Sequence, residues 1–273
     1  MKIFVASAFS KDGAGGNLAG VCLYGEGLGR QGKIAIAREL GFSETAFVSA
    51  GQKGDFLLEY FTPTDEVDLC GHATIAAFVV MRKLLPLKKD KFIIETKSGN
   101  LAVFFDGDLI FMEQNKPEFF EILEPADVAG CFGGDVVDSC LPIEIGSTGL
   151  KDIILPVKNL QILENMKPNF DKISEISDKF GVVGVHAFTI DGARVVCRNF
   201  APLYGIDEEA ATGTSNCVLA SYLWKNGILR QDEYIFEQGY NLGNPSEIIV
   251  RLDVCGGDIK KVNVGGRGHL VQS

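Results

Sequence analysis

The stretch that decides the fold reads Glu66-Val67-Asp68-Leu69-Cys70-Gly71-His72-Ala73-Thr74-Ile75-Ala76-Ala77-Phe78-Val79-Val80-Met81. From Ile75 to Val80 every residue is apolar, whereas a helix on a protein surface shows one apolar stripe. We therefore predict a helix that is buried on all sides. It begins with side chains that hold protons, and the free backbone N–H groups of a helix start attract anions. A buried helix with a polar start is typical of a binding or catalytic site.

The same arrangement returns at 208–224, where Thr212-Gly213-Thr214 aligns with Cys70-Gly71-His72. Two further segments match in the same order: Tyr60-Phe61-Thr62-Pro63 with Asn199-Phe200-Ala201-Pro202, and Thr45-Ala46-Phe47-Val48 with His186-Ala187-Phe188-Thr189. These matches suggest a duplication, although common apolar residues can also match by chance. The period is too long for a solenoid. It predicts two similar domains whose helix starts face each other.

Composition limits the class of protein. The chain has 273 residues, enough for one large domain or two of ordinary size, and 46% of them are hydrophobic. A formal net charge of −10 argues against nucleic acid or an anionic membrane as partner. No apolar run reaches the length of a membrane span, and the first residues lack the pattern of a signal peptide. Seven cysteines, an odd number without regular spacing, favour a reduced, cytoplasmic protein.

Alternating and helical patterns predict more strands than helices, joined mostly by short turns. They indicate an α+β fold of two pseudo-symmetric domains, each a curled, mainly antiparallel sheet around a central buried helix. We place the domains at 1–116 and 117–273, linked by Lys116-Pro117-Glu118, with the option that the last strand returns to the first domain. A weak helix is expected from Asp127 toward Gly133, and another helix at 170–180.

A set of motifs runs through nearly the whole chain: Gly16-Asn17-Leu18-Ala19-Gly20-Val21, Ser43-Glu44-Thr45-Ala46-Phe47-Val48, Phe61-Thr62-Pro63, Leu69-Cys70-Gly71-His72-Ala73-Thr74, Arg198-Asn199-Phe200-Ala201-Pro202, Ala211-Thr212-Gly213-Thr214, Glu237-Gln238-Gly239, Gly243-Asn244-Pro245-Ser246 and Val264-Gly265-Gly266. Together and in this order they resemble the phenazine-biosynthesis isomerase-like (PhzF-like) family, which has the diaminopimelate epimerase fold. Each motif alone is weak, whereas the ordered set is specific.

The resemblance implies an isomerase with its active site in the cleft between two domains, without cofactor or metal, and a homodimeric assembly. The family's proton-shuttling Glu corresponds to Glu44, and its His corresponds to His72. Glu209 stands where the family usually has an Asp followed by proline, and here Ala210 follows it. Thr214 stands where Ser is usual. These departures leave the role of Glu209 and the identity of the substrate open.

A proton-shifting isomerase needs groups close to the substrate that take a proton from carbon and return it. Glu44, flanked by Phe42 and Phe47, is expected to do both as general acid/base. The substrate is expected to be a small carboxylate, held by the N–H groups after Gly71 or Gly213 at the two helix starts. With the correspondences that the resemblance implies, the predicted catalytic residues are Glu44, His72 and Glu209. Substrate-binding residues are predicted as Asn17, Cys70, Gly71, Thr212, Gly213 and Thr214.

Two other functions stay open. A helix start favours a thiolate, so Cys70 could serve a one-cysteine racemase- or dehydratase-like enzyme. Its counterpart Thr212 has a hydroxyl too weakly acidic for racemisation by two thiols. Cys70 could equally be a buried small hydrophobic residue, and Glu44 a solvated turn residue. The second alternative is a non-catalytic binding protein on the same scaffold, which the altered Glu209-Ala210 pair favours.

Metal-dependent hydrolysis is disfavoured, because the three histidines, His72, His186 and His269, lie at no spacing typical of metal ligands. His186 is expected in the core or at its edge, and His269 in the tail.

Overall fold

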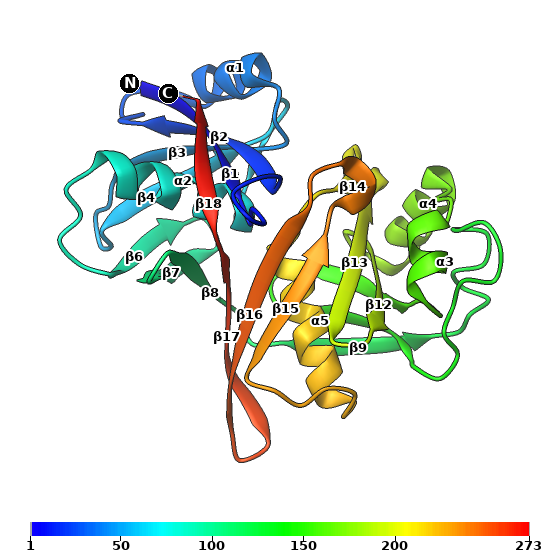
Figure 1. Ribbon diagram of the computed structural model, residues 1–273. Coiled ribbons are helices and arrows are strands. Elements are labelled where there is room, and N and C mark those ends of the chain that lie inside the picture. Colours follow the sequence, from blue (N-terminus) through cyan, green and yellow to red (C-terminus); the bar gives the residue numbers. More distant parts are fainter. Residues whose placement is uncertain (1, 273) are drawn as a thin grey trace. The chain divides into compact units, whose positions relative to one another are not determined.

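The computed structural model of the chain describes residues 2–272 (Figure 1). They divide into two compact units. The first runs to Glu113 and includes the segment from Gly265 onward, and the second is Gln114–Val264. Each unit is an α+β fold in which a mainly antiparallel sheet packs on a buried helix, as the sequence predicts.

The elements up to residue 114 are β1 (Lys2–Ala8), β2 (Asn17–Leu23), α1 (Arg30–Leu40), β3 (Thr45–Ala50), β4 (Phe56–Phe61), β5 (Glu66–Val67), α2 (Gly71–Leu84), β6 (Lys91–Thr96), β7 (Gly99–Asp106) and β8 (Leu109–Gln114). Those that follow are β9 (Glu118–Leu123), β10 (Ile143–Ser147), β11 (Lys151–Pro156), α3 (Leu160–Asn165), α4 (Phe170–Phe180), β12 (Gly184–Asp191), β13 (Arg194–Ala201), β14 (Ile206–Glu209), α5 (Gly213–Lys225), β15 (Glu233–Gln238), β16 (Ser246–Cys255), β17 (Asp258–Gly266) and β18 (Gly268–Gln272). Two 3₁₀ turns lie at Pro202–Tyr204 and Tyr240–Leu242.

Helix α2 forms the core of the first unit. It contacts β1, β2, β3 and β18, and its residues from Gly71 to Met81 are buried except Val79, which is half-buried. The ring of Phe78 is fully buried in an aromatic cluster with Phe56, Phe92 and Phe105, at ring-centroid distances of 6.2, 5.6 and 6.0 Å. Apolar residues on every face of the helix thus meet packed neighbours on every face.

A second helix, α1, covers another part of the same sheet. It contacts β3 and β4, and the residues buried between them are Cys22, Ile34, Ala37, Phe47 and Phe61. Gly41 ends this helix with φ of 71°, a left-handed conformation that favours glycine. Because Glu44 follows three residues later, the end of α1 fixes where the chain enters β3.

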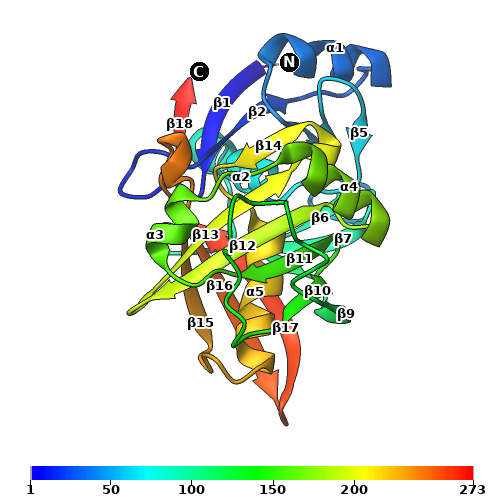
Figure 2. The same cartoon turned by 90° about the vertical axis from the view of Figure 1, so that its right-hand side faces the viewer.

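The second unit has the same layers. Helix α5 contacts β10, β11 and β16, while α3 and α4 contact β12 and β13. Figures 1 and 2 show α3 and α4 in green beside these two strands. The side chains of α4 that pack against the sheet include Ile173 and Ile176, within one hydrophobic cluster that also contains Ile153 and Leu155 of β11. The neighbouring residue Asp152 belongs to the opposite face, where it contacts α5.

The two units share one order of elements. β1 and β2 pair antiparallel, as do β10 and β11, and a helical crossover then leads to a parallel third strand, β3 or β12. An antiparallel hairpin follows, β3–β4 or β12–β13. The buried helix α2 or α5 then connects to another parallel neighbour, β6 or β15. The repeat in the sequence therefore corresponds to a repeat in the fold.

Some local predictions are wrong. Residues 127–133 form turns and not a helix, because Gly130 and Gly134 adopt φ of 82° and 92° there. Strand β9 begins at Glu118, inside the expected link, and pairs with β10. Helix α3 and the short strands β5 and β14 were not predicted from the sequence. In the described part of the chain no helix has the length and apolar character needed to span a membrane.

We predict that Phe78→Ala lowers the free energy of unfolding by about 3–5 kcal/mol, because it removes the ring at the centre of the aromatic cluster and leaves a cavity. Urea denaturation monitored by circular dichroism measures this. Ile93→Ala, which truncates a side chain that is 38% exposed on β6, is the control and should cost far less. Equal losses in both variants would contradict the central position of α2.

Candidate active site

Three side chains that can hold protons converge at the start of α2. The Cys70 sulfur lies 3.4 Å from Nδ1 of His72, and the Glu44 Oε2 atom lies 3.4 Å from Nε2 of the same ring. The hydroxyl of Ser43 also lies 3.4 Å from Nε2. All of these residues belong to the first unit, so the imidazole joins a thiol on one side to a carboxylate on the other.

Two hydrogen bonds of Thr74 hold the start of α2 in place. The hydroxyl of Thr74 donates to the carbonyl oxygen of Cys70 at 2.7 Å, and it also bonds the hydroxyl of Tyr60 on β4 at 2.6 Å. Burial raises the pKa of Tyr60 far above its usual value, so this phenol stays neutral. Cys70 is the N-cap residue, has extended dihedrals and makes no side-chain capping hydrogen bond. The first amides of α2 are therefore not satisfied by a cap.

Glu44 reaches this point from the opposite side, directly before β3. Its carbonyl oxygen accepts a hydrogen bond from the amide of Gly20 on β2. The Glu44 side chain is 14% exposed, and its Oε2 atom is buried without a hydrogen-bond donor among residues 2–272. A buried carboxylate oxygen in need of a donor is suited to receive a proton or a polar substrate group.

A second group of polar residues lies at the start of α5. The hydroxyl of Thr212 donates to Oε2 of Glu209 at 3.0 Å, and the side-chain amide of Gln238 donates to the hydroxyl of Thr212 at 3.1 Å. Thr212 is the N-cap residue and, like Cys70, makes no side-chain capping hydrogen bond. The side chain of Glu209 is thus oriented by the residue from which α5 starts.

His186 is linked to this group through the side chain of Asn216, and it is a fully buried core residue, as expected. The Asn216 side-chain amide donates to the carbonyl oxygens of Thr212 and of the Gln238 side chain, so its own Oδ1 faces His186 Nε2 at 3.3 Å. Nε2 must then carry the hydrogen, and Nδ1 accepts from the Asn199 amide at 3.2 Å. Burial lowers the pKa of His186 to about 4, which keeps this ring neutral.

The same chain of hydrogen bonds continues to a buried carboxylate. The Asn199 amide donates to the hydroxyl of Ser215, and this hydroxyl donates to Oδ2 of Asp152 at 2.7 Å. Burial raises the pKa of Asp152 to about 7, Ser215 opposes the shift, and the charge of Glu209 adds to it. Each donor in this chain of hydrogen bonds therefore has one possible direction. The hydrogens point away from Asn199, through Ser215 to Asp152 on one branch. On the other branch they point through His186 and further side chains to Glu209.

The structure brings the predicted residues together in two groups. Glu44, Cys70, Gly71 and His72 meet at the start of α2, and Glu209, Thr212, Gly213 and Thr214 lie at the start of α5. Asn17 is the half-buried first residue of β2. Ser43 and Gln238 both lie in motifs quoted above, yet neither had a predicted role, and no sequence pattern indicated Asp152.

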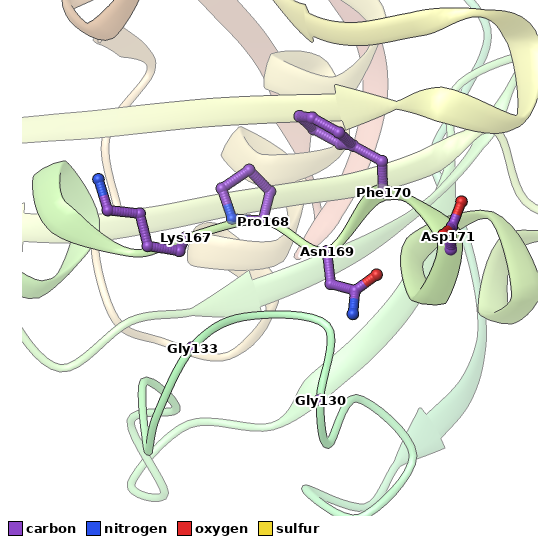
Figure 3. Close-up of a pocket in the computed structure, with 7 residues that line it drawn as sticks. All are labelled: Gly130, Gly133, Lys167, Pro168, Asn169, Phe170 and Asp171. Atoms are coloured by element: carbon purple, nitrogen blue, oxygen red, sulfur yellow. The ribbon is translucent and has the colours of Figure 1, made fainter.

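A hollow elsewhere in the second unit offers less chemistry. It measures about 560 Å³ and lies beside the start of α4 (Figure 3). Its charged lining residues, Lys167 and Asp171, have opposite signs. The side chain of Asn169 already caps α4 by accepting from the Lys172 amide. This hollow therefore has neither an acid/base pair nor a vacant helix start.

Comparison with known proteins places the chain among isomerases. A sequence profile of the phenazine biosynthesis-like proteins matches residues 6–273. An uncharacterized isomerase of Bacillus subtilis, YfhB, is 33% identical over 95% of this chain and 92% of its own length. The trans-2,3-dihydro-3-hydroxyanthranilate isomerase of Pseudomonas aeruginosa is 27% identical over 97% of this chain and 95% of its own length. A PhzF-family crystal structure from Bacillus anthracis superposes with a TM-score of 0.88 at 29% identity, covering 100% of this chain and 98% of that one.

Asp152 makes the stability of the protein depend on pH. Its pKa of about 7 in the folded protein exceeds the usual value of 3.8, so its contribution to stability is present below about pH 4 and is lost as the pH rises to about 7. We predict that Asp152→Asn lacks this loss. The free energy of unfolding of the variant, relative to the wild type, should rise by at most about 4 kcal/mol across this interval.

Urea denaturation at several pH values measures the difference. Ser215→Ala should extend the sensitive interval above pH 7, because it removes a donor that favours the charged carboxylate. Parallel pH profiles for the wild type and Asp152→Asn would contradict the assignment.

Proposed function

The chain belongs to the phenazine biosynthesis-like protein family, and on that premise we propose that it is a cofactor-independent isomerase that moves a carbon-bound proton on a small carboxylate substrate. Glu44 is the proposed general acid/base. The observation that carries this proposal is the buried Glu44 oxygen without a hydrogen-bond donor in residues 2–272, 3.4 Å from the ring of His72.

Glu44 has the properties that a proton shuttle needs. Moving a hydrogen from one carbon to another requires a group that takes the proton from the first carbon and gives it to the second while the substrate stays bound. A carboxylate is small enough to reach neighbouring carbons of one bound molecule. His72, in contact with Glu44, can donate to the carboxylate or to a substrate oxygen on which charge develops.

The start of α2 supports a carboxylate as substrate. The N-terminal amides of α2 carry partial positive charge and are not capped by a side chain. The P. aeruginosa relative is named for an anthranilate, which carries a carboxylate group. We propose that Thr212, Thr214 and Glu209 contribute to binding the same substrate. The role of these three residues is proposed because their helix start repeats that of α2. A homodimeric assembly and a cytoplasmic location are predictions from the sequence.

A racemase- or dehydratase-like enzyme is the second candidate. It is favoured by the contact between Cys70 and Nδ1 of His72, since an imidazole beside a thiol can remove the thiol proton. The thiolate would then take the proton from carbon in place of Glu44. Only Cys70 of the two helix starts offers a thiol, because Thr212 occupies the corresponding position.

Glu44→Gln should lower turnover by at least about 10²–10⁴-fold, because the amide keeps the shape of the side chain and cannot take a proton. The assay follows hydrogen exchange and product formation by NMR in deuterated water, with trans-2,3-dihydro-3-hydroxyanthranilate as the first of a panel of small carboxylates. Glu39→Gln, an exposed substitution on α1, is the control and should keep full activity. Full activity of Glu44→Gln would remove Glu44 from the mechanism.

Cys70→Ser separates the two candidate functions. An isomerase based on Glu44 should keep its activity within about 10-fold, whereas an enzyme that uses the thiol as base should lose more than about 100-fold. The same NMR assay measures both. If neither variant nor the wild type exchanges a carbon-bound hydrogen on any acid that it binds, the chain is a binding protein instead.

A further inference from the structure

The group at the start of α2 also has the composition of a metal site. Glu44, Cys70 and His72 each offer one ligand atom, and these three atoms lie within 4.8 Å of one another. All three residues lie in the first unit, and the side chains of Glu44 and His72 are only 14% and 6% exposed. Carboxylate, thiolate and imidazole together form a ligand set that binds zinc in proteins.

The distance between the thiol and the imidazole suits a tetrahedral ion. Zinc binds sulfur at about 2.3 Å and nitrogen at about 2.0–2.1 Å, and tetrahedral geometry then separates the two ligand atoms by about 3.5 Å. The Cys70 sulfur and His72 Nδ1 are 3.4 Å apart. The separation of the two atoms therefore already matches that of two ligands on one ion.

The other ring nitrogen has the partner that a zinc-bound histidine needs. When Nδ1 binds the metal, Nε2 carries the hydrogen and must donate it. The hydroxyl of Ser43 lies 3.4 Å from Nε2 and can accept it. Glu44 is then released from Nε2, and its carboxylate has to shift to join the other two ligands around the ion.

Charge favours the same arrangement. A thiolate and a carboxylate together neutralise a divalent cation, so the loaded site carries no net charge in its buried surroundings. Binding releases the Cys70 proton to solvent. With three protein ligands the fourth position stays with water, as in open zinc sites.

We propose that Glu44, Cys70 and His72 form a zinc-binding site and that zinc there inhibits the enzyme by occupying its acid/base. The inhibition rests on the proposed function, whereas the binding does not. Mg²⁺ and Ca²⁺ prefer oxygen ligands and should not compete.

The experiment uses the metal-free full chain carrying Cys140→Ser and Cys255→Ser, which remove the two exposed thiols. Zn²⁺ is titrated in competition with a chromophoric chelator, and Co²⁺ is added separately to record the charge-transfer band of a cobalt–thiolate bond. We expect one Zn²⁺ per chain, a cobalt–thiolate band and loss of isomerase activity that a chelator reverses. Cys70→Ser should weaken zinc binding by more than about 100-fold and abolish the band.

Cys22→Ala is the matched control, because Cys22 is buried in the same unit, where it packs with Ile34 and Ala37 of α1. It should leave binding and the band unchanged. Equal zinc affinity with and without Cys70, a band that persists in Cys70→Ser, or equal competition by Mg²⁺ would overturn the site. Zinc binding at Cys70 with full activity would overturn the inhibition. If the chain turns over no carboxylate at all, the proposed function fails, and the cobalt band still decides the metal site.

Discussion

Burial of helix α2 from Gly71 to Met81 is the constraint on which the first unit depends. Because strands and aromatic rings surround the helix, its first turn cannot move or fray as a surface helix would. The Tyr60–Thr74–Cys70 hydrogen bonds fix that turn further. A side-chain cap would satisfy its first amides, and the chain has none at Cys70. The packing therefore holds rigid a helix start that can bind an anion.

The repeat is regular in fold and unequal in chemistry. The two units share strand order, crossovers and buried helices, yet Val185 stands in the second unit where Glu44 stands in the first. Thr212 and Thr214 likewise replace Cys70 and His72. Among the described residues, the contact between a carboxylate and an imidazole at the start of a buried helix thus occurs in the first unit and not in the second. The start of α5 has instead a buried chain of neutral amides and hydroxyls that fixes the orientation of Thr212 and, through it, Glu209.

Much of this arrangement could be predicted from the sequence where one residue pattern determines the structure. An uninterrupted apolar run identified α2, and the return of the same arrangement identified α5. Helix α4 has the bounds that its pattern indicates, Phe170–Phe180. The ordered set of motifs predicted that Glu44 and His72 belong to one site, and the two side chains lie in contact. The contact of Cys70 and Ser43 with opposite nitrogens of one ring could not be predicted, because it depends on the orientation of the imidazole.

Asp152 shows the same limit in the second unit. It lies on an otherwise apolar strand, and its pairing with Ser215 joins residues 63 positions apart. No periodic pattern reports such a pairing. The failed helix at 127–133 has another cause, since glycines with positive φ outweigh the weak helical pattern around them.

A crystal structure of the enzyme with the product of its own turnover would show whether Glu44 reaches the carbon that exchanges hydrogen. We expect a product carboxylate at the start of α2 and a Glu44 oxygen within about 3.5 Å of the carbon that exchanges hydrogen, the distance at which a bound group can react. A product bound out of reach of Glu44, for example in the hollow beside α4, would contradict this expectation.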